Sequence, residues 1–408
     1  MDIQDFTGAT LKHHHNENYD QSPDYSAELA SVLDKESCDN AYRTISDWDG
    51  YAPSPLVALS GLAKKIGIAD ILYKHEGGRF GLGSFKALGG AYSVLQLLIQ
   101  EVSKATSMQI SADDIISGEY ATIIREITVV TATDGNHGRS VAWGAEKFGC
   151  NCFIYMHAGV SNGRAKAVEA FGATVIWVDG NYDQSVHEAA EAAAKNDWFV
   201  VSDTSYEGYT ELPKNVMAGY TVMTTEIIQQ LPKDKLPTHV FVQGGVGGLA
   251  GAVCAHLWQS LGAERPRFVI VEPDRADCLF QSGLRGEITD VSIEEETIMA
   301  GLSCGEVSSL AWQILLGGTN DFVTIEDELI APTMKLLAKG VGEDQPLVAG
   351  ESAVAGLAGA IAARMNNELT AKLGLDASSR ILIFGTEGAT DPAIYEKIVG
   401  LSPADVGV

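Results

Sequence analysis

Short apolar runs rich in β-branched residues alternate with small-residue, amphipathic stretches along most of the chain. Between residues 126 and 196 this alternation repeats three times, and each predicted strand is followed by a predicted helix: EITVVTAT, NCFIYMH and ATVIWVD, then DGNHGRSVAWGAEKFG, SNGRAKAVEAFG and YDQSVHEAAEAAAKN. The first helix carries an apolar stripe at helical spacing, formed by Val141, Ala142, Ala145 and Phe148. Successive strand–helix units predict an α/β fold with open, mainly parallel sheets covered by helices on both faces.

The same pattern recurs later in the chain and indicates two domains. The runs THVFVQGG, RFVIVEP and SRILIFGT are predicted strands separated by helical segments. A chain of 408 residues is long enough for more than one hydrophobic core. We therefore predict an N-terminal extension, a large domain in two segments and a small α/β domain: residues 1–45, 46–90 with 221–408, and 91–220. Within the small domain, residues 101–125 read as an exposed helical connection.

The composition and charge narrow the class of partner. Hydrophobic residues make up 46% of the chain and charged residues 20%, which is typical of a globular protein. The formal net charge is -26, and this excess of Asp and Glu repels nucleic-acid phosphates and acidic membrane surfaces. We therefore expect a small-molecule ligand, with no nucleic acid and no membrane as partner.

The N-terminus and the cysteines indicate the compartment. The first twenty residues contain no apolar signal segment, and no stretch approaches the roughly 20 apolar residues that cross a bilayer, so we expect a cytoplasmic protein. The six cysteines are scattered, and Cys150 and Cys152 form C-x-C, so we expect reduced thiols and no metal site. The triplet at residues 13–15, HHH, reads as part of an untethered polar tail, with metal ligation or an expression tag as alternatives.

Lys86 follows a glycine-rich turn in the stretch RFGLGSFKALGGAY. Ser84 can cap the helix that begins there, and Ala87, Leu88 and Ala91 continue it at helical spacing. A lysine near a buried helix N-terminus has a lowered pKa, which makes its amine a better nucleophile or Schiff-base former. The alternative is a solvent-facing lysine in a first turn.

A second glycine-rich turn, QGGVGGLAG, lies between a predicted strand and a predicted helix. Successive backbone amides aimed by a helix N-terminus form a phosphate cradle, here Gly244, Gly245, Val246, Gly247 and Gly248. The loop lacks the Lys-Ser/Thr ending of a nucleotide P-loop and the spacing of a dinucleotide-binding fingerprint. Phosphate binding and tight packing both remain open for this turn.

Two further turns end predicted strands with polar groups. TATDGNHGRS offers an acid, an amide and an imidazole where open α/β sheets place their ligands. Amides at its helix start can hold a carboxylate, and Asn136 can donate to an aromatic oxygen; an Asp helix cap is the alternative. IFGTEGATDP presents Thr386, whose neutral hydroxyl can meet a ring nitrogen without protonating it. Together these turns offer an amine that can form an imine, backbone amides for a phosphate, an amide for an aromatic oxygen and a hydroxyl for a ring nitrogen. This combination predicts pyridoxal 5'-phosphate as the cofactor.

The motifs GSFKALGGAY, TATDGNHGR, QGGVGGLAG and GTEGATD, in this order, resemble the fold-type II pyridoxal-phosphate enzymes, the tryptophan synthase β family. Within it, the stretches RFGLGSFKALGGAY, ATDGNHGRSVAWGAEKFG, VVSDTSYEGYTELP and TIMAGLSCGE resemble the diaminopropionate ammonia-lyases, from about residue 50 to 395. The resemblance implies a homodimer with its cofactor in the interdomain cleft. It also implies a carbon–nitrogen lyase that converts 2,3-diaminopropionate and water to pyruvate and two ammonia.

The resemblance also implies roles for individual residues. Lys86 matches the Schiff-base lysine, and Asp134 and Asp203 match two acids thought to serve opposite faces of Cα, for the D- and L-substrate respectively. Residues of the pocket and substrate site would be Thr133, Gly135, His137 and Tyr209. Cys278 and Cys304 lie in matched stretches and could approach each other, although reduced thiols are the default.

Other functions remain open. The nearest alternative is a serine/threonine-type dehydratase or a β-replacement enzyme of the same fold, against which stands Asp134, where those dehydratases usually carry serine. An acid there can protonate a departing amine and attract its positive charge, whereas a hydroxyl substrate needs no such anion. A non-catalytic cofactor- or nucleotide-binding regulatory protein is the remote alternative.

Overall fold

The computed structural model describes residues 3–133, 135–232 and 234–407, and the chain divides into two compact units. Unit 1 and unit 2 each contain a sheet and are built from discontinuous segments: Met1–Lys35, Ala52–Ser84 and Met223–Val408 for unit 1, Glu36–Tyr51 and Phe85–Val222 for unit 2. The chain therefore passes between the units four times. Among the described residues, no helix is long and apolar enough to cross a membrane.

The sheet of unit 1 has seven strands in the order β1-β10-β9-β8-β11-β3-β2. The five inner strands run parallel, and the two edge strands β1 and β2 pair antiparallel with their neighbours. In chain order the bounds are β1 (Lys12–His15), β2 (Leu56–Ala58), β3 (Asp70–His75), β8 (His239–Gln243), β9 (Arg267–Pro273), β10 (Asp321–Ile325) and β11 (Arg380–Gly385). The predicted mainly parallel sheet is confirmed.

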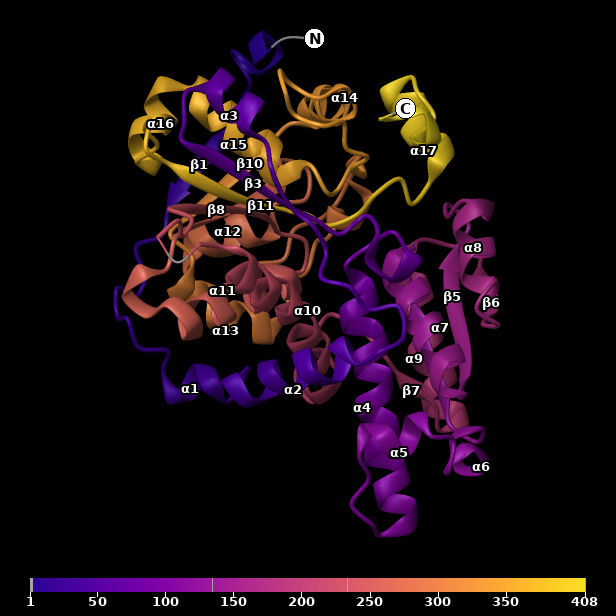
Figure 1. Ribbon diagram of the computed structural model, residues 1–408. Coiled ribbons are helices and arrows are strands. Elements are labelled where there is room, and N and C mark those ends of the chain that lie inside the picture. Colours follow the sequence, from indigo (N-terminus) through magenta and orange to yellow (C-terminus); the bar gives the residue numbers. More distant parts are fainter. Residues whose placement is uncertain (1–2, 134, 233, 408) are drawn as a thin grey trace. The chain divides into compact units, whose positions relative to one another are not determined.

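Helices cover both faces of this sheet (Figure 1). One face carries α3 (Ser60–Ile66), α14 (Ile330–Lys339), α15 (Ala355–Met365) and α16 (Asn367–Leu373); the other carries α11 (Gly248–Leu261), α12 (Cys278–Arg285) and α13 (Ser309–Gly318). The unit also contains α1 (Ala27–Ala30) and α17 (Pro392–Val399). Fully buried Leu357 and Ile361 of α15 pack in one cluster with Phe241, Val271 and Ile383 of the strands, so α15 fills the core on its side.

Unit 2 is built on a fully parallel four-stranded sheet, β6-β5-β4-β7. Its strands are β4 (Thr128–Ala132), β5 (Asn151–His157), β6 (Thr174–Val178) and β7 (Phe199–Val200), and its helices are α2 (Lys35–Ser46), α4 (Lys86–Thr106), α5 (Ala112–Ile116), α6 (Ala121–Ile124), α7 (Asn136–Phe148), α8 (Asn162–Glu169) and α9 (Tyr182–Asn196). Val130 of β4 and Tyr155 of β5 pack in one hydrophobic cluster with Ala189 and Ala193 of α9. Helix α10 (Glu211–Gln230) begins in unit 2 and ends in unit 1.

The strongly periodic segments fold as predicted. The bounds of β5, β9 and α9 coincide with the predicted runs NCFIYMH, RFVIVEP and YDQSVHEAAEAAAKN. Residues 101–125 contain the end of α4 followed by the short helices α5 and α6, and most of their side chains are exposed or half-buried. The predicted small domain at residues 91–220 falls within the longer segment of unit 2.

The untethered polar tail predicted around residues 13–15 is wrong, because these residues pair with β10, and the predicted extension at residues 1–45 is divided between the two units. Residues up to Lys35 belong to unit 1, and the following residues join unit 2. The triplet HHH forms most of β1, where His13 Nε2 and His15 Nδ1 donate to Asp321 Oδ1 at 2.9 and 3.1 Å. Asp321 is fully buried and also receives Arg267 Nε at 2.6 Å. A polar edge strand is stable here because a buried carboxylate needs its donors.

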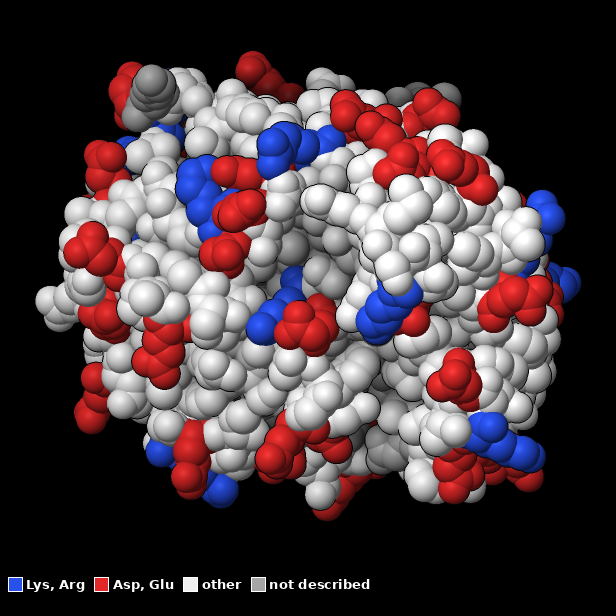
Figure 2. All heavy atoms as spheres, turned by 90° about the horizontal axis from the view of Figure 1, so that it is seen from below, with Lys and Arg blue, Asp and Glu red and all other residues white. Residues whose placement is uncertain are grey.

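Acidic side chains are scattered over the face shown in Figure 2, and blue Lys and Arg side chains are fewer there, in line with the net charge of -26. No group of three or more His, Cys, Asp or Glu side chains is arranged to hold a metal ion in the described part of the chain.

Candidate active site

Lys86 is the first residue of α4 and follows a turn of unusual backbone geometry. Phe80, Gly81 and Gly83 have φ values of 49°, 72° and 78°, in the left-handed region that favours glycine. The Lys86 side chain is 22% exposed and pairs with the carboxylate of Asp203. Its ammonium also lies 5.4 and 5.8 Å from the ring centres of Phe85 and Tyr220. The helix-start position predicted for Lys86 is confirmed, and the rings of Phe85 and Tyr220 lie beside its amine.

The helix cap predicted from Ser84 is wrong. The N-cap position of α4 is occupied by Phe85, and no side chain caps the helix. Ser84 instead forms a bridge with Glu387, and the amide of Gly388 donates to the carbonyl of Gly83 at 2.9 Å. The turn is therefore tied to the loop that follows β11.

Asp203 lies in the loop after β7 and is held in its ionised form. Its side chain is 17% exposed, accepts a hydrogen bond from Lys86 Nζ and lies 3.8 Å from Nδ1 of His137. Burial alone raises the pKa of this carboxyl, but the positive charge of Lys86 and the neighbouring His137 outweigh burial and lower it. Asp203 is therefore a carboxylate that can accept a proton.

Two side chains hold the segment that carries Asp203. His137 Nε2 donates to the carbonyl of Val201 at 2.8 Å, which fixes a proton on Nε2 and turns Nδ1 towards Asp203. The hydroxyl of Tyr209 donates to the carbonyl of Val200 at 2.9 Å and accepts the amide of Ser202 at 3.0 Å. The structure thus places His137 and Tyr209, both expected at the substrate pocket, as supports of Asp203.

The loop after β4 is shaped by Thr133. Its hydroxyl accepts the amides of Gly135 and Gly138 at 3.0 and 3.2 Å, and helix α7 begins at Asn136. A side chain at Gly138 would place Cβ 2.1 Å from Cγ2 of Thr133, so this turn requires glycine. Asp134 lies outside the described residues.

The glycine-rich turn in unit 1 connects β8 to the start of α11. Gly245 and Gly247 have φ values of 68° and 97°, which side chains rarely adopt. Gly244 donates its amide to the carbonyl of Val271 at 3.0 Å, which corrects the expected cradle of five amides to four. Within the described residues, the amides of Gly245, Val246, Gly247 and Gly248 donate to no other protein group. Four amides at a helix N-terminus suit an anion.

Thr386 directly follows β11 and has a defined hydrogen-bond polarity. Its buried hydroxyl oxygen accepts from Nε2 of Gln243 at 3.0 Å, and the same amide group donates to the carbonyl of Phe384 at 2.9 Å. Because an amide nitrogen only donates, the Thr386 hydroxyl keeps its own hydrogen for another acceptor. A neutral heteroaromatic nitrogen is such an acceptor.

The two cysteines at the glycine-rich turn, Cys278 and Cys304, are thiols. The thiol of Cys278 lies 3.6 Å from the carbonyl oxygen of Gly245, and the sulfur of Cys304 lies 3.8 Å from the place that a Cβ on Gly245 would take. Burial, followed by the charge of Glu272, raises the pKa of the Cys278 thiol. It is therefore protonated at neutral pH.

Comparisons with known proteins agree with this arrangement. The family model described as "Pyridoxal-phosphate dependent enzyme" matches residues 48–384. The diaminopropionate ammonia-lyase of Escherichia coli strain K12 is 40% identical over 357 residues, which cover 86% of this chain and 88% of that protein. Two crystal structures of the Escherichia coli enzyme match with TM-scores of 0.86 and 0.87 at 35% identity, each covering 96% of this chain and 97% of theirs. One contains an aminoacrylate-PLP azomethine reaction intermediate and the other contains D-serine.

The chain belongs to the pyridoxal-phosphate-dependent enzymes and, within them, to the family of the diaminopropionate ammonia-lyases. Its cofactor is pyridoxal 5'-phosphate (PLP), and the predicted fold-type II architecture is confirmed. The residues in hand fit this cofactor, because they supply a lysine beside a carboxylate, four amides at a helix start and a hydroxyl poised to donate.

Sequence reasoning missed Gln243, which sets the polarity of Thr386. It stands directly before the glycine-rich turn, and a polar residue at the end of an apolar strand was the available signal. The turn IFGTEGATDP also presents Glu387, which the structure shows as a buried acid that accepts the amide of Ser352 at 3.1 Å. Both act on the loop after β11.

We predict that Tyr209→Phe lowers kcat/KM by roughly tenfold, since two hydrogen bonds that hold the Asp203 segment are lost, at about 1–3 kcal/mol. Steady-state kinetics at equal cofactor content measure the effect. Tyr206→Phe is the matched control, because that ring is 56% exposed. Equal kinetics for both variants would argue against the supporting role of Tyr209.

A second prediction concerns the cradle. Gly245→Asp should weaken PLP retention by at least about tenfold, because it adds strain at a positive φ and an anion beside a phosphate. Cofactor content after dialysis measures the effect. Gly400→Asp introduces the same charge at a φ of 83° in open space, and this control should retain its cofactor. Loss from both variants, or from neither, would contradict the prediction.

Proposed function

We propose that this protein catalyses the PLP-dependent elimination of 2,3-diaminopropionate, as the D form, the L form or both, to pyruvate and two ammonia. The observation that carries the proposal is the ionised carboxylate of Asp203 against Lys86. It supports proton removal from Cα by a side chain already free of its proton at neutral pH. The 40% identity with a diaminopropionate ammonia-lyase supports the substrate.

Lys86 would hold PLP through its amine, and the amides of Gly245 to Gly248 would bind the phosphate. Thr386 would donate its hydroxyl hydrogen to the ring nitrogen, and Asn136 would donate to the phenolic oxygen. When bound, PLP draws electron density from the Cα–H bond and makes this proton removable.

The two acids and Lys86 would carry out the proton transfers to and from the substrate. Asp203 takes the Cα proton of the L-substrate and, by the family resemblance, Asp134 takes that of the D-substrate. The β-nitrogen leaves as ammonia once it has gained a proton, since a protonated amine is the better leaving group. By the family resemblance, Asp134 supplies an acid for the departing amine. The remaining enamine gains a proton at Cβ, and water then replaces the second nitrogen at Cα, so that pyruvate and a second ammonia are formed. His137 stays bonded to Val201 and keeps Asp203 ionised when Lys86 is engaged with the cofactor.

A dehydratase acting on serine is the second candidate, because a D-serine complex of the Escherichia coli enzyme is known. We also propose a homodimer, as the family resemblance implies, and a cytoplasmic location. The six cysteines are thiols, which supports a reducing compartment.

A substrate panel tests the function. We expect pyruvate and ammonia in a ratio of one to two from diaminopropionate, with slower release of pyruvate from D- or L-serine. Lys86→Ala should lose the visible absorption band of lysine-bound PLP and nearly all turnover. Faster turnover of serine than of either diaminopropionate enantiomer would make the protein a dehydratase, and full turnover by Lys86→Ala would contradict the role of the lysine.

The two-acid model makes a separate prediction. Asp203→Asn should lower turnover of the L-substrate more than that of the D-substrate, and Asp134→Asn should do the reverse. A positioned base on one face of Cα cannot reach the other face, and its loss costs about a hundredfold to ten-thousandfold. Kinetics on each pure enantiomer at one pH measure both effects. Equal losses for both enantiomers would contradict the model and leave Lys86 as the single proton carrier.

A further inference from the structure

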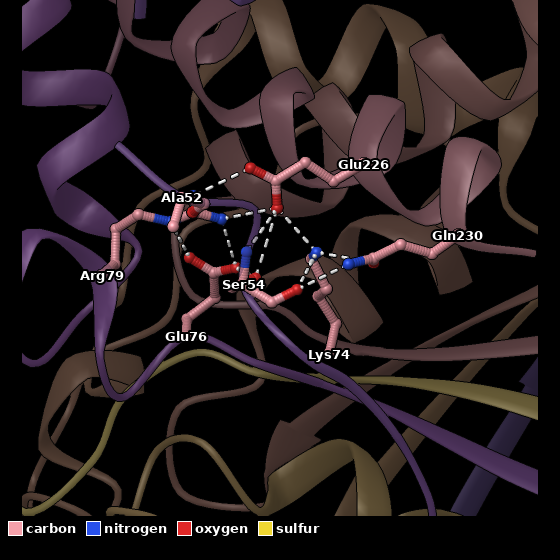
Figure 3. A network of polar contacts seen from close by, with 7 residues as sticks. All are labelled: Ala52, Ser54, Lys74, Glu76, Arg79, Glu226 and Gln230. Carbon is pink, nitrogen blue, oxygen red and sulfur yellow. Dashed lines mark hydrogen bonds and ion pairs between the residues drawn. The ribbon is translucent and has the colours of Figure 1, made fainter. Parts of the chain in front are cut away.

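Five buried residues of unit 1 and the exposed Gln230 form a polar network, here called the buried clamp: Ser54, Lys74, Glu76, Arg79, Glu226 and Gln230 (Figure 3). The side chains of its four charged members are at most 1% exposed. None of the six belongs to the cofactor-binding groups above, so the clamp needs a separate explanation.

Arg79 lies at the centre of the clamp, between two carboxylates. Its Nε and Nη2 donate to both oxygens of Glu76 at 2.8 Å, and its Nη1 and Nη2 donate to both oxygens of Glu226 at 2.8 Å. Nη1 also donates to the carbonyl of Ala52 at 3.1 Å. Two bidentate pairs fix the guanidinium in its plane and orientation.

Lys74 balances the second carboxylate charge. Its Nζ lies 2.6 Å from Glu226 Oε2 and donates to the carbonyl of Ser54 at 2.8 Å and to Gln230 Oε1 at 3.0 Å. The amide of Ser54 donates to Glu226 at 3.0 Å. Burial alone raises the pKa of Glu226, but hydrogen bonds and charge from Arg79 and Lys74 lower it. The clamp therefore holds two cations and two anions.

Stability alone is a weak reason for four buried charges, because desolvation offsets most of their attraction and apolar residues can be as stable. What such a network offers is one defined geometry. Its members stand at the places where the chain changes unit: Ser54 follows the crossing at residues 51–52, Arg79 precedes that at 84–85, and Glu226 follows that at 222–223. The clamp thus joins three of the four crossing segments.

The crossing at residues 84–85 leads directly to Lys86. The turn between Arg79 and Ser84 contains three residues with positive φ, one of them the non-glycine Phe80, so it persists only when its ends are fixed. Arg79 fixes the start, and the bonds of Gly83 and Ser84 to the loop after β11 fix the end. A second connection runs along α10, which carries Glu226 in the clamp and Tyr220, whose ring lies 5.8 Å from Lys86 Nζ.

We propose that the buried clamp positions Lys86 for reaction with PLP, with Arg79, Glu76 and Glu226 as positioning residues. The clamp acts through the turn at residues 79–84 and through α10, and it touches neither cofactor nor substrate. The inference rests on the proposed role of Lys86.

The test measures how fast apoenzyme forms the lysine-bound absorption band after PLP is added. Glu226→Gln keeps the size of the side chain but removes its charge, and Arg79→Lys keeps the charge but removes the bidentate geometry. Both should slow band formation by at least about tenfold, since a misplaced amine must be reoriented before it reacts. Borohydride reduction followed by peptide mass spectrometry should show that the remaining label is still on Lys86.

Asp321→Asn is the matched control. Asp321 is also fully buried and bonded to an arginine of unit 1, Arg267, but it stands away from the crossing segments in sequence. The Asp321→Asn substitution should lower the thermal unfolding temperature of the apoenzyme, as the clamp substitutions do. This variant should nevertheless form the absorption band within about twofold of the wild-type rate. The inference is overturned if band formation slows equally in the clamp variants and in this control, or if it slows in neither.

Ser54→Ala extends the test should the charged variants not fold. It removes hydroxyl bonds to Glu76 and Glu226 but leaves every charge in place, so band formation should slow in the same direction by a smaller factor. A wild-type rate in this variant would then overturn the inference. Failure of the proposed role of Lys86 is distinguishable, because in that case Lys86→Ala would still form the band, and failure of the proposed substrate is seen separately in the substrate panel.

Discussion

Parallel strands place the turn that follows each strand at the same edge of their sheet, and the site depends on this constraint. In unit 1, β8, β11 and β3 are neighbours, and they lead to the glycine-rich turn, to Thr386 and to the turn before Lys86. In unit 2, β4 and β7 are neighbours, and they lead to the Thr133 loop and to Asp203. Groups distant in sequence therefore gather without any long loop.

Electrostatics then decides which of these groups is chemically active. Asp203 is largely buried, and burial favours the neutral acid, yet Lys86 and His137 keep it ionised. His137 contributes through Nδ1, which faces the carboxylate and attracts it when protonated, while Nε2 donates to the carbonyl of Val201. The carboxylate, the amine and the imidazole thus form one unit whose charges depend on each other, and Tyr209 fixes the backbone on which the carboxylate is mounted.

The discontinuous units impose a second requirement, which the buried clamp meets. Neither unit is a single stretch of chain, so several crossing segments must be held in register for Lys86 to keep its place. Backbone hydrogen bonds of the sheet stop at the ends of the strands. Beyond those ends, bidentate ion pairs hold the crossing segments in one geometry. Because these ion pairs are buried, water and salt screen them less.

The sequence by itself determined the periodic elements and the chemistry at their ends. The bounds of β5, β9 and α9 follow from local periodicity, and Lys86 and Thr386 were found because glycine-rich turns mark strand and helix ends. Only the tertiary structure decided the rest. The strand containing His13 forms because Asp321, far along the chain, needs donors, and Glu226 meets Arg79 across 147 residues of sequence. The Ser84 cap failed because bonds to the loop after β11 turn the chain before the helix begins. Polar residues have no periodic signature, so their partners are set by packing alone.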